Sequence, residues 1–545
     1  MGIIVYRGGF ILFHPSHFTQ GLGERFRVMA TQVNIGSFLH RRAAMNPQRL
    51  AYIDGNSDVR LSFAELSARV DGLANAFLDA GIQKGERVGL LLMNSPEFVE
   101  SYFALATVGA VIVPLNWRLV PDELEFILKD SGTKRLIFGE EFLDSVAELH
   151  ARGDKTDLSH YLQVRGEQEI AHFAQEYQGF RDSGMGGGVP DYGGFDEDMV
   201  YIMYTSGTTG LPKGVVHTHT SCFWAMLTIF ATADYHDGDV NLAPLPMFHV
   251  GALTPITLNV YAGVTSVVMR SFDPARAWQL LGEERVTTGL LVPAMLNFML
   301  QVKVPPAETY AGLRWIMTGA APVPVSLVKA YDEIGIQMLE IYGLTETCGP
   351  TCLMDPDNAL IKAGSTGRSF YFTDVKITDE QGEEVARGVA GEVSVRGGHV
   401  MREYWNRPEA TAETLVDGWL RTGDVAMMDE DGYVFIQDRI KDMIISGGEN
   451  VYPAELESVL MTHPKISEAA VIGQESAKWG ESPFAIVVRT DDSLSESEVV
   501  NYCADKLAAF KRPQGAAFVD VIPRNPSGKI LKRVLRDQFP KTAPV

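Results

Sequence analysis

The sequence predicts an α/β protein with a large N-terminal domain of parallel-rich sheets flanked by helices, a small β-rich subdomain, and a small α+β C-terminal domain. Short apolar strands alternate with helical stretches over residues 33–142 and again from 200 to about 335, a pattern typical of βαβ units and parallel sheets. From 364 to 435, short strands are joined by glycine-containing turns. After Asp438 about a hundred residues follow with a compact α+β pattern.

Local patterns place the N-terminal elements. Apolar periodicity predicts helices over 62–80, 96–107 and 121–131. Compact apolar runs predict strands over 87–92, 111–115, 136–138 and 200–204. The glycine-rich stretch 184–194 predicts a surface connection. In the β-rich part, strands are expected over 392–396, 419–421 and 433–436.

The domain boundaries are expected near residues 28 and 438. Residues 1–28 lack the basic start and the cleavage site of a signal peptide, and they precede the first well-patterned segment. We therefore predict a poorly ordered extension at 1–28, an N-terminal domain at 29–438 and a C-terminal domain at 439–545.

The composition limits the classes of binding partner and the compartment that we expect for this protein. The net charge of −22 argues against a general affinity for nucleic acid or anionic membranes. The four cysteines form no CxxC pair and no zinc spacing, which favours reduced thiols in the cytoplasm. Since no transmembrane helix is evident, any membrane association is expected to be peripheral. The sequence leaves a homodimer open.

The segment 204–215 (YTSGTTGLPKGV) is the strongest functional motif. It follows a predicted strand and combines three glycines, four hydroxyl side chains and Lys213 in one loop. Glycines let backbone N–H groups approach a ligand closely, so the loop suits a polyphosphate. It is not a Walker A loop, because Pro212 stands where the second glycine is required.

This loop resembles the phosphate-binding signature of the adenylate-forming superfamily, which includes acyl-CoA synthetases, peptide-synthetase adenylation domains and luciferases. Further segments resemble that family's motifs in the family's order: 246–250 (PMFHV), 318–322 (TGAAP), 342–346 (YGLTE), 418–424 (GWLRTGD), 438–442 (DRIKD) and 525–530 (NPSGKI). Together they cover residues 33 to about 540, which makes chance similarity a poor explanation.

The resemblance implies a role for each matching residue. Lys529, Glu346 and His249 are expected in catalysis, with Lys441 at the hinge of a mobile C-terminal domain. Magnesium is expected on Thr205 and Glu346. The expected ATP- and AMP-binding residues are Thr205, Ser206, Gly207, Thr208, Thr209, Gly210, Lys213, Gly319, Ala320, Ala321, Tyr342, Gly343, Thr345, Asp424 and Arg439. The expected acyl-pocket residues are Phe248, His249, Val250, Gly251, Leu253 and Thr318.

These residue types fit the chemistry that the resemblance implies. A carboxylate must approach the α-phosphate of ATP, so one anion meets another, and well-placed cations and dipoles lower that barrier by several kcal/mol each. Lys529 would bridge the two reactants, because lysine carries a compact charge on a long stem.

The second half-reaction is expected to use CoA. Ser446, Gly447 and Gly448 follow an apolar strand predicted at 443–445 and precede a helix that begins at Pro453 and ends at Pro464. The glycines leave room for a pantetheine arm. No carrier domain follows Lys529 in the sequence, which also favours CoA as the thiol.

The carboxylic acid substrate is expected to be a medium- to long-chain fatty acid. The residues next to His249 in sequence are apolar or small and include no Arg or Lys, which argues against malonate-like diacids. The motifs 444–453 and 404–411 resemble bacterial long-chain and very-long-chain fatty acyl-CoA synthetases. Aryl and cinnamate-type CoA ligases share nearly all these motifs and are the main alternative.

Two other classes stay open on sequence grounds. A luciferase-like oxygenase would use its own adenylate with oxygen, although no residue specifically indicates this. A silent binder of nucleotides or acyl groups would not need Lys529 alongside Glu346 and Asp424.

Overall fold

The computed structural model describes residues 32–205, 211–446, 449–476, 480–503, 506–524 and 530–539. It also describes the backbone of a paired hairpin, β1 (Ile3–Tyr6) and β2 (Gly9–Leu12). The rest of the proposed extension at 1–28 lies outside the described residues.

Two large, mostly parallel sheets dominate the described part of the N-terminal region, one of eight strands and one of nine. The first has the order β21 (Glu403–Tyr404), β11 (Lys213–Thr218), β10 (Met199–Thr205), β6 (Val111–Pro114), β5 (Arg87–Leu91), β7 (Arg135–Gly139), β8 (His160–Val164), β9 (Gln175–Glu176). The second has the order β18 (Arg368–Ser369), β17 (Cys352–Leu353), β16 (Met338–Tyr342), β15 (Trp315–Gly319), β14 (Thr288–Leu291), β12 (Val240–Ala243), β13 (Thr265–Val268), β3 (Leu50–Asp54), β4 (Arg60–Ser62). This arrangement confirms the predicted fold class.

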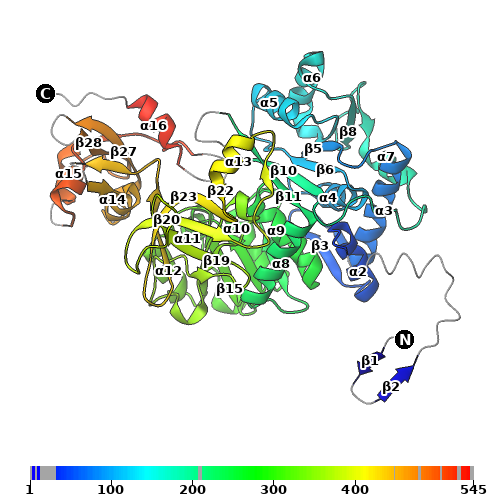
Figure 1. The fold of residues 1–545 in the computed structure, drawn as a ribbon, viewed down its shortest axis with the longest axis horizontal. Coiled ribbons are helices and arrows are strands. Elements are labelled where there is room, and N and C mark those ends of the chain that lie inside the picture. Colours follow the sequence, from blue (N-terminus) through cyan, green and yellow to red (C-terminus); the bar gives the residue numbers. More distant parts are fainter. Residues whose placement is uncertain are drawn as a thin grey trace.

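Helices cover the faces of these sheets (Figure 1). They are α2 (Gly36–Met45), α3 (Phe63–Asp79), α4 (Pro96–Val108), α5 (Pro121–Ser131), α6 (Leu143–Ala151), α7 (Tyr177–Ser183), α8 (His219–Thr232), α9 (Val250–Ala262), α10 (Pro274–Glu283), α11 (Pro293–Gln301) and α12 (Val325–Glu333).

Capping residues explain where the early helices begin and end. At α3, the Ser62 side chain accepts from the N–H of Glu65, whose carboxylate in turn accepts from the N–H of Ser62. Helix α4 starts at Pro96 after the Ser95 cap and ends at Gly109, whose φ of 76° is in the left-handed region. The predicted helices and strands of this region therefore lie within a few residues of their expected limits.

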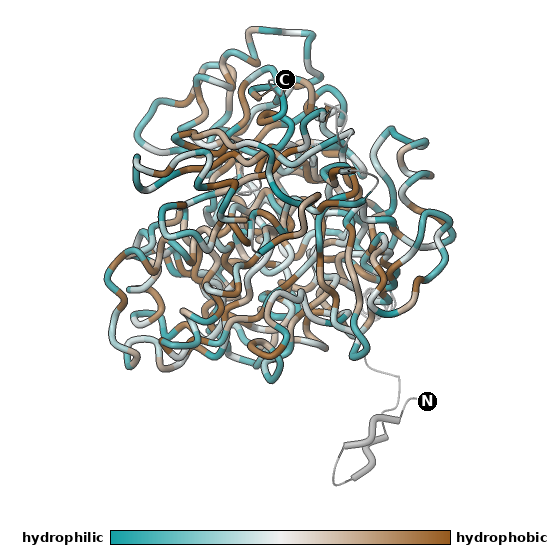
Figure 2. Tube along the Cα trace, turned by 90° about the vertical axis from the view of Figure 1, so that its left-hand side faces the viewer, coloured by the Kyte–Doolittle hydropathy of each residue, from teal (hydrophilic) through white to brown (hydrophobic). Residues whose placement is uncertain are grey.

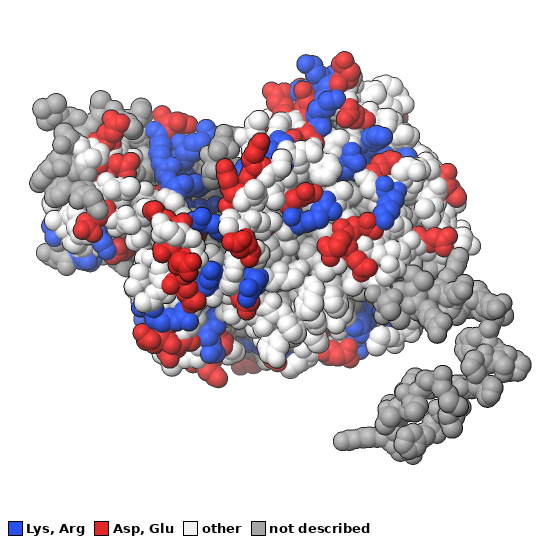
Figure 3. Space-filling model, viewed as in Figure 1, with Lys and Arg blue, Asp and Glu red and all other residues white. Residues whose placement is uncertain are grey.

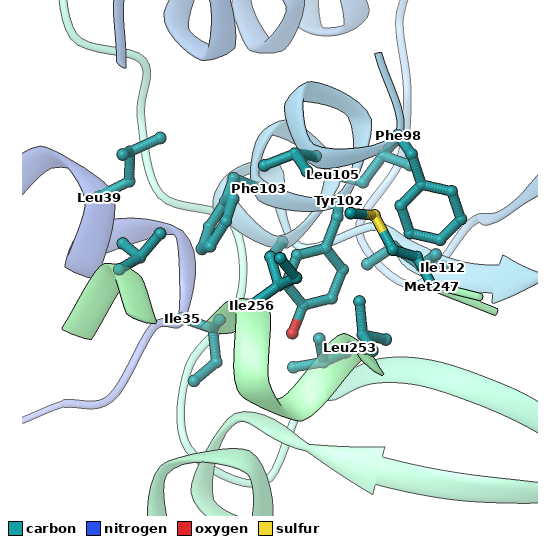
Figure 4. Packing of buried hydrophobic residues seen from close by; sticks show 14 of the residues in the cluster. Ile35, Leu39, Phe98, Tyr102, Phe103, Leu105, Ile112, Met247, Leu253 and Ile256 are labelled. Atoms are coloured by element: carbon teal, nitrogen blue, oxygen red, sulfur yellow. The ribbon is translucent and has the colours of Figure 1, made fainter. Parts of the chain in front are cut away.

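One large apolar cluster joins α3, α4, α8 and α9 to strands of both sheets. Figure 4 shows Tyr102 and Phe103 of α4 packed toward Leu253 and Ile256 of α9. The rings of Tyr102 and Phe103 meet edge to face at 5.1 Å. The outermost loops are hydrophilic (Figure 2), so the apolar residues hold the two sheets together from inside.

The β-rich part forms a sheet of its own. Its strands are β19 (Asp374–Thr378), β20 (Gly391–Arg396), β23 (Trp419–Met428), β22 (Leu415–Val416) and β24 (Val434–Arg439). The strand expected at 419–421 is thus much longer, because β23 pairs on one edge with β20 and on the other with β24. Helix α13 (Pro408–Thr414) precedes it.

The C-terminal elements form a small body beside this sheet, shown in orange and red in Figure 1. Its described strands are β25 (Ile444–Ser446), β26 (Glu449–Val451), β27 (Ile466–Ser476), β28 (Gly480–Arg489) and β29 (Ala516–Phe518), and its helices are α14 (Pro453–Leu460), α15 (Glu496–Tyr502) and α16 (Lys532–Gln538). No helix among the described residues is both long and apolar enough to cross a bilayer.

Helix α14 ends before the expected limit at Pro464. The hydroxyl of Thr462 donates to the carbonyl of Val459 at 2.7 Å, and the N–H of His463 donates to Leu460. These bonds satisfy the last carbonyls of the helix and turn the chain before proline can act.

We predict that Phe103→Ala destabilises the N-terminal region by about 3–5 kcal/mol, because it empties a fully buried site between the sheets. Urea unfolding followed by intrinsic fluorescence measures the loss. Phe230→Ala serves as the control, since that ring is 40% exposed on α8 and its removal leaves no core cavity. Equal losses in the two variants would contradict the assignment of Phe103 to the core.

Candidate active site

A cavity of about 1580 Å³ lies where the large sheets, the β23–β24 sheet and the C-terminal body meet. Thr205, Gly319 and Tyr342, the last residues of β10, β15 and β16, all line it. Ala454 and Lys532 line it from the C-terminal side. Ligands in open α/β sheets bind at the carboxyl ends of strands, so this position favours a substrate site.

Most described residues that the sequence analysis singled out line this one cavity. They are Thr205, Lys213, His249, Val250, Gly251, Gly319, Ala320, Ala321, Tyr342, Gly343, Thr345, Glu346, Asp424 and Arg439. Eight other predicted residues, Ser206, Gly207, Thr208, Thr209, Gly210, Gly447, Gly448 and Lys529, lie outside the described residues.

Three residues expected in the acyl pocket lie behind its wall instead. Leu253 points from α9 into the core beside Tyr102 (Figure 4), because α9 turns its His249, Val250 and Gly251 side toward the cavity. Thr318 is fully buried within β15, and Phe248 is 3% exposed. These three residues support the wall and do not form its surface.

Ser446 and Lys441 also lie outside the cavity lining. The Ser446 hydroxyl is fully buried and has no partner among the described residues, since β25 turns it into the C-terminal body. Lys441 is exposed, one residue beyond Ile440, whose N–H donates to the carbonyl of Gly423. Neither side chain meets the cavity in this arrangement of the two parts.

Asp424 connects the floor of the cavity to the junction with the C-terminal body. Its carboxylate accepts from the Tyr342 hydroxyl at 2.6 Å and pairs with Arg439 at 2.9 Å. The backbones of Asp424 and Arg439 are also register partners in β23 and β24. Two partners on one buried carboxylate hold its position at the edge of the cavity.

Glu346 stands in the short helical turn after β16, on the phosphate-loop side of the cavity. Its Oε1 accepts from the Tyr404 hydroxyl at 2.8 Å. The Lys213 ammonium lies 5.1 Å from the centre of the Tyr404 ring. Tyr404 therefore contacts both the Glu346 carboxylate and the Lys213 ammonium. The backbones of Lys213 and Thr205 are register partners in adjacent strands.

Oxygen ligands from Glu346 and Thr205 would fit a magnesium ion. Magnesium usually takes one or two protein oxygens and completes its shell with water and substrate phosphates. Both residues line the cavity, as does Lys213 at the far end of the segment that resembles a phosphate-binding signature. The donor set is thus suited to a nucleotide-bound ion, not to a closed structural metal site.

His249 directly precedes the first residue of α9, makes no capping bond with its side chain, and lines the cavity. Burial and, secondarily, the charge of Arg118 lower the pKa of its imidazole to about 4. Its Nε2 is shielded from solvent and has no partner among the described residues. The ring is therefore neutral near pH 7 and offers one unsatisfied nitrogen to a ligand.

Arg118 corrects an argument made from the sequence. The residues next to His249 in sequence carry no cation, yet Arg118, which follows β6, lines the same cavity. Its guanidinium lies 4.0 Å from the centre of the Trp117 ring and 6.0 Å from that of Phe248. The sequence feature that could have identified Arg118 is its position just after a predicted parallel strand, because site residues commonly lie at the carboxyl ends of such strands.

Glu340 is a second cavity residue that sequence reasoning missed. It sits within β16, is 7% exposed, and burial raises the pKa of its carboxyl to about 8. The available signal was an acid inside an otherwise apolar strand, 338–342. A buried carboxyl group of this kind either contacts a ligand or lowers the stability of the fold.

Backbone geometry also shapes the site. Ala320 has a φ of 66°, a left-handed value that is uncommon outside glycine, and it lines the cavity. A Cβ on Gly343 would lie 1.4 Å from the carbonyl oxygen of Gly349, so only glycine fits there.

Positive side chains gather at the junction between the two parts (Figure 3). Arg439, Lys511, Arg524 and Lys532 line the cavity there. They supply local cations in a chain whose net charge is −22.

We predict that His249 makes the folded protein less stable in acid. The folded state holds the ring with a pKa of about 4, whereas an unfolded histidine has about 6.5, so the unfolded chain binds more protons between these values. From pH 7 to pH 5 this removes about 2 kcal/mol of stability. Between the two pH values, urea unfolding should show a loss of stability in the wild type that is about 2 kcal/mol larger than in His249→Gln, because buried His219 and His399, whose pKa values are also about 4, contribute to both proteins alike. Identical pH dependence in the two proteins would contradict the buried neutral ring.

Comparisons with known proteins agree with this geometry. Residues 39–405 match the family model described as AMP-binding enzyme, and residues 455–529 match that of the AMP-binding enzyme C-terminal domain. The chain is 44% identical to the Long-chain-fatty-acid–CoA ligase FadD13 of Mycobacterium tuberculosis over 94% of this chain and 99% of that protein. It is 38% identical to a feruloyl-CoA synthase of Amycolatopsis over 93% and 99%.

A solved structure of o-succinylbenzoate CoA synthetase from Bacillus subtilis, in complex with its acyl-adenylate intermediate, has a TM-score of 0.81 to this chain. The two are 31% identical, over 93% of this chain and 98% of that one. Because the family model covers more than half of the chain and these relatives match it over nearly their full length, the chain belongs to the AMP-binding enzyme family.

Proposed function

We propose that the protein is an acid–CoA ligase that activates its acid with ATP and transfers the acyl group to CoA. The observation that carries this is the gathering of Glu346, Lys213 and His249, with Asp424 nearby, around one cavity at the junction of two parts. Its relatives, all named as acid-activating ligases or synthases, support the same class.

In the first half-reaction, a carboxylate oxygen of the acid bonds to the α-phosphorus of ATP, and the bond from that phosphorus to the bridging oxygen breaks. Pyrophosphate leaves, and the acid remains joined to AMP. The loop ending at Lys213, together with Lys529, would neutralise the growing negative charge, and Asp424 would hold the ribose hydroxyls. A bound magnesium ion, held by Glu346 and Thr205, would supply further positive charge at the phosphates.

In the second half-reaction, the CoA thiol gives its proton to solvent, its sulfur bonds to the acyl carbonyl carbon, and the bond from that carbon to the phosphate oxygen breaks as AMP leaves. Ser446 and the glycines after it are our candidates for contact with the pantetheine arm. A rotation of the whole C-terminal body cannot uncover the Ser446 hydroxyl, which is buried inside it, so the contact would be made by the backbone of β25 once the body presents this strand in another orientation. Lys441 stands at the exposed joint where such a rotation would occur.

We propose that the acid is a medium- to long-chain fatty acid. Apolar side chains line the part of the cavity between α8, α9 and α11, namely Ile229, Leu245, Val250, Leu290, Val292, Met295 and Phe298. These walls favour an aliphatic chain through burial of apolar area. The similarity to a long-chain fatty acid ligase supports the same class.

A second candidate, an aromatic acid, is favoured by the wall around Arg118. Its guanidinium stacks on Trp117 at 4.0 Å, and Trp117 meets Phe248 edge to face at 6.0 Å. Trp117 and Arg118, which both line the cavity, would suit an aryl group with a polar substituent.

An acid panel tests the proposal. Pyrophosphate release and CoA consumption are measured with straight-chain acids of increasing length and with cinnamate-type acids. We expect release with aliphatic acids, and thioester formation only when CoA is present. Release with aromatic acids alone would favour the second candidate, and no release with any acid would contradict the ligase assignment.

Two substitutions should separate the half-reactions. Lys441→Pro fixes φ at the joint and removes an N–H, so it should spare pyrophosphate release and block thioester formation. Lys529→Ala should lower adenylate formation by about 10²-fold or more while sparing thioester formation from a supplied acyl-adenylate.

The control for the first substitution is Lys441→Ala, which removes the side chain and keeps backbone freedom. Adenylation and thioester formation are followed separately, by pyrophosphate release and by free-thiol consumption. Equal loss of both steps in Lys441→Pro would contradict a role for this residue as a joint.

A further inference from the structure

The turn that carries Glu346, η4 (Thr345–Thr347), is held from two sides by buried histidines. Nε2 of His217 donates to the carbonyl of Thr345 at 2.7 Å. Nδ1 of His399 donates to the carbonyl of Thr347 at 2.9 Å. Because a carbonyl only accepts, each contact requires a proton on the named ring nitrogen.

Two more bonds complete the support of this turn. The N–H of Met401 donates to the carbonyl of Glu346 at 2.8 Å, and the Thr254 hydroxyl donates to that of Cys348 at 2.8 Å. Four consecutive carbonyls thus accept from four residues on other segments. The turn also requires a φ of 55° at Cys348, a value that ordinary side chains disfavour, so outside contacts are needed to keep it.

The two imidazoles are themselves fixed. Both are fully buried. Ser221 contacts Nδ1 of His217 at 3.0 Å, and the Thr373 hydroxyl donates to Nε2 of His399 at 2.7 Å. A ring with a partner on each nitrogen has little freedom to rotate, which is how outer residues orient a ligating group.

The same framework reaches the phosphate-loop side of the cavity. His217 lies on β11, the strand that begins with Lys213. Strand β11 pairs with β21, and this places Tyr404, whose hydroxyl binds the Glu346 carboxylate at 2.8 Å. The positions of the Glu346 backbone and of its side chain therefore both depend on β11.

We propose that His217 and His399 are positioning residues, which hold the turn so that the Glu346 carboxylate meets the magnesium–ATP complex. This inference rests on the proposed function, in which Glu346 binds that ion. A purely structural role for the histidines predicts lower stability without any selective effect on the metal-bound nucleotide.

Substitutions can keep or remove each donor separately. In His217→Gln the amide nitrogen can take the place of Nε2, and in His399→Asn it can take the place of Nδ1. His217→Leu and His399→Leu remove the donors. In the exchanged amides, His217→Asn and His399→Gln, the side-chain N–H lies at the wrong distance from the backbone to replace the imidazole donor. These variants test the positioning role even if a leucine variant fails to fold.

The readout is ATP binding by calorimetry, with magnesium and with a chelator. We expect the leucine and exchanged-amide variants to weaken magnesium–ATP binding by about 10-fold or more, with little change for ATP alone. His217→Gln and His399→Asn should restore most of the lost affinity. In a Glu346→Gln background, His217→Leu should cause no further loss, because both changes act on the same contact.

His219→Leu is the matched control. That ring is also fully buried, two residues beyond His217, but its Nδ1 accepts from the N–H of Ile35, away from the turn. We expect it to lower the melting temperature without selective loss of magnesium–ATP affinity. Equal weakening of ATP binding with and without magnesium, or full additivity with Glu346→Gln, would overturn the proposal.

Failure of the ligase assignment would be seen separately. Binding needs no acid, so a protein that binds magnesium–ATP but releases no pyrophosphate with any acid would contradict the proposed function alone. A wild type that releases pyrophosphate, with positioning variants that keep full magnesium selectivity, would contradict the inference alone.

Discussion

Charge is the constraint on which the rest of this site depends, because the proposed reaction brings a carboxylate to a phosphate inside a chain with a net charge of −22. Several of the cations that line the cavity are each held by an acid. Lys532, 10% exposed in its side chain, pairs with Glu457 at 2.9 Å, and Lys511 pairs with Glu455 at 2.7 Å. A buried ammonium needs such a partner to stay charged, so the acids stabilise the positive surface that faces the cavity.

Ion pairs also indicate where the rotation proposed above would occur. Strand β24 belongs to the N-terminal sheet as far as Arg439, which is held by Asp424. Asp442 pairs with Arg536 of α16 at 2.8 Å, so it belongs to the C-terminal body. Only Ile440 and Lys441 lie between these two anchors. We infer that a rotation at these two residues would carry the whole C-terminal body and leave the β23–β24 pairing intact.

The fold class and most elements could be predicted from the sequence because they depend on local signals. A capping serine, a proline at the first helical position and a glycine at the end define α4 wherever it packs. Most described residues of the predicted nucleotide site line the cavity. Their motifs follow parallel strands, and the direction of a strand determines at which edge of the sheet the next residues lie. Lys529 and the phosphate-loop core lie outside the described residues and stay predictions.

The acyl side was harder to predict because its residues come from distant segments. The charge of Arg118 acts on His249 from the end of β6, an electrostatic interaction across more than a hundred residues of sequence that no local pattern contains. Leu253 was placed wrongly for a related reason. Its neighbours in sequence line the cavity, but the 3.6-residue period of α9 turns it toward Tyr102. His399 gave no signal at all, since its role depends on the carbonyl of Thr347.

The wall formed by α9 shows how backbone chemistry bears on the choice of acid. A Cβ on Gly251 would meet only Leu245, at 3.7 Å, so packing does not require glycine and its small size adds room to the cavity. Pro255, also on the wall, has no N–H to donate to the carbonyl of Gly251 four residues earlier. The cavity face of α9 thus combines extra space with a polar acceptor near His249. A carboxylate only accepts hydrogen bonds, so this acceptor would repel it, and the carboxyl end of the acid is better suited to lie beside the cations of the cavity than beside the Gly251 carbonyl.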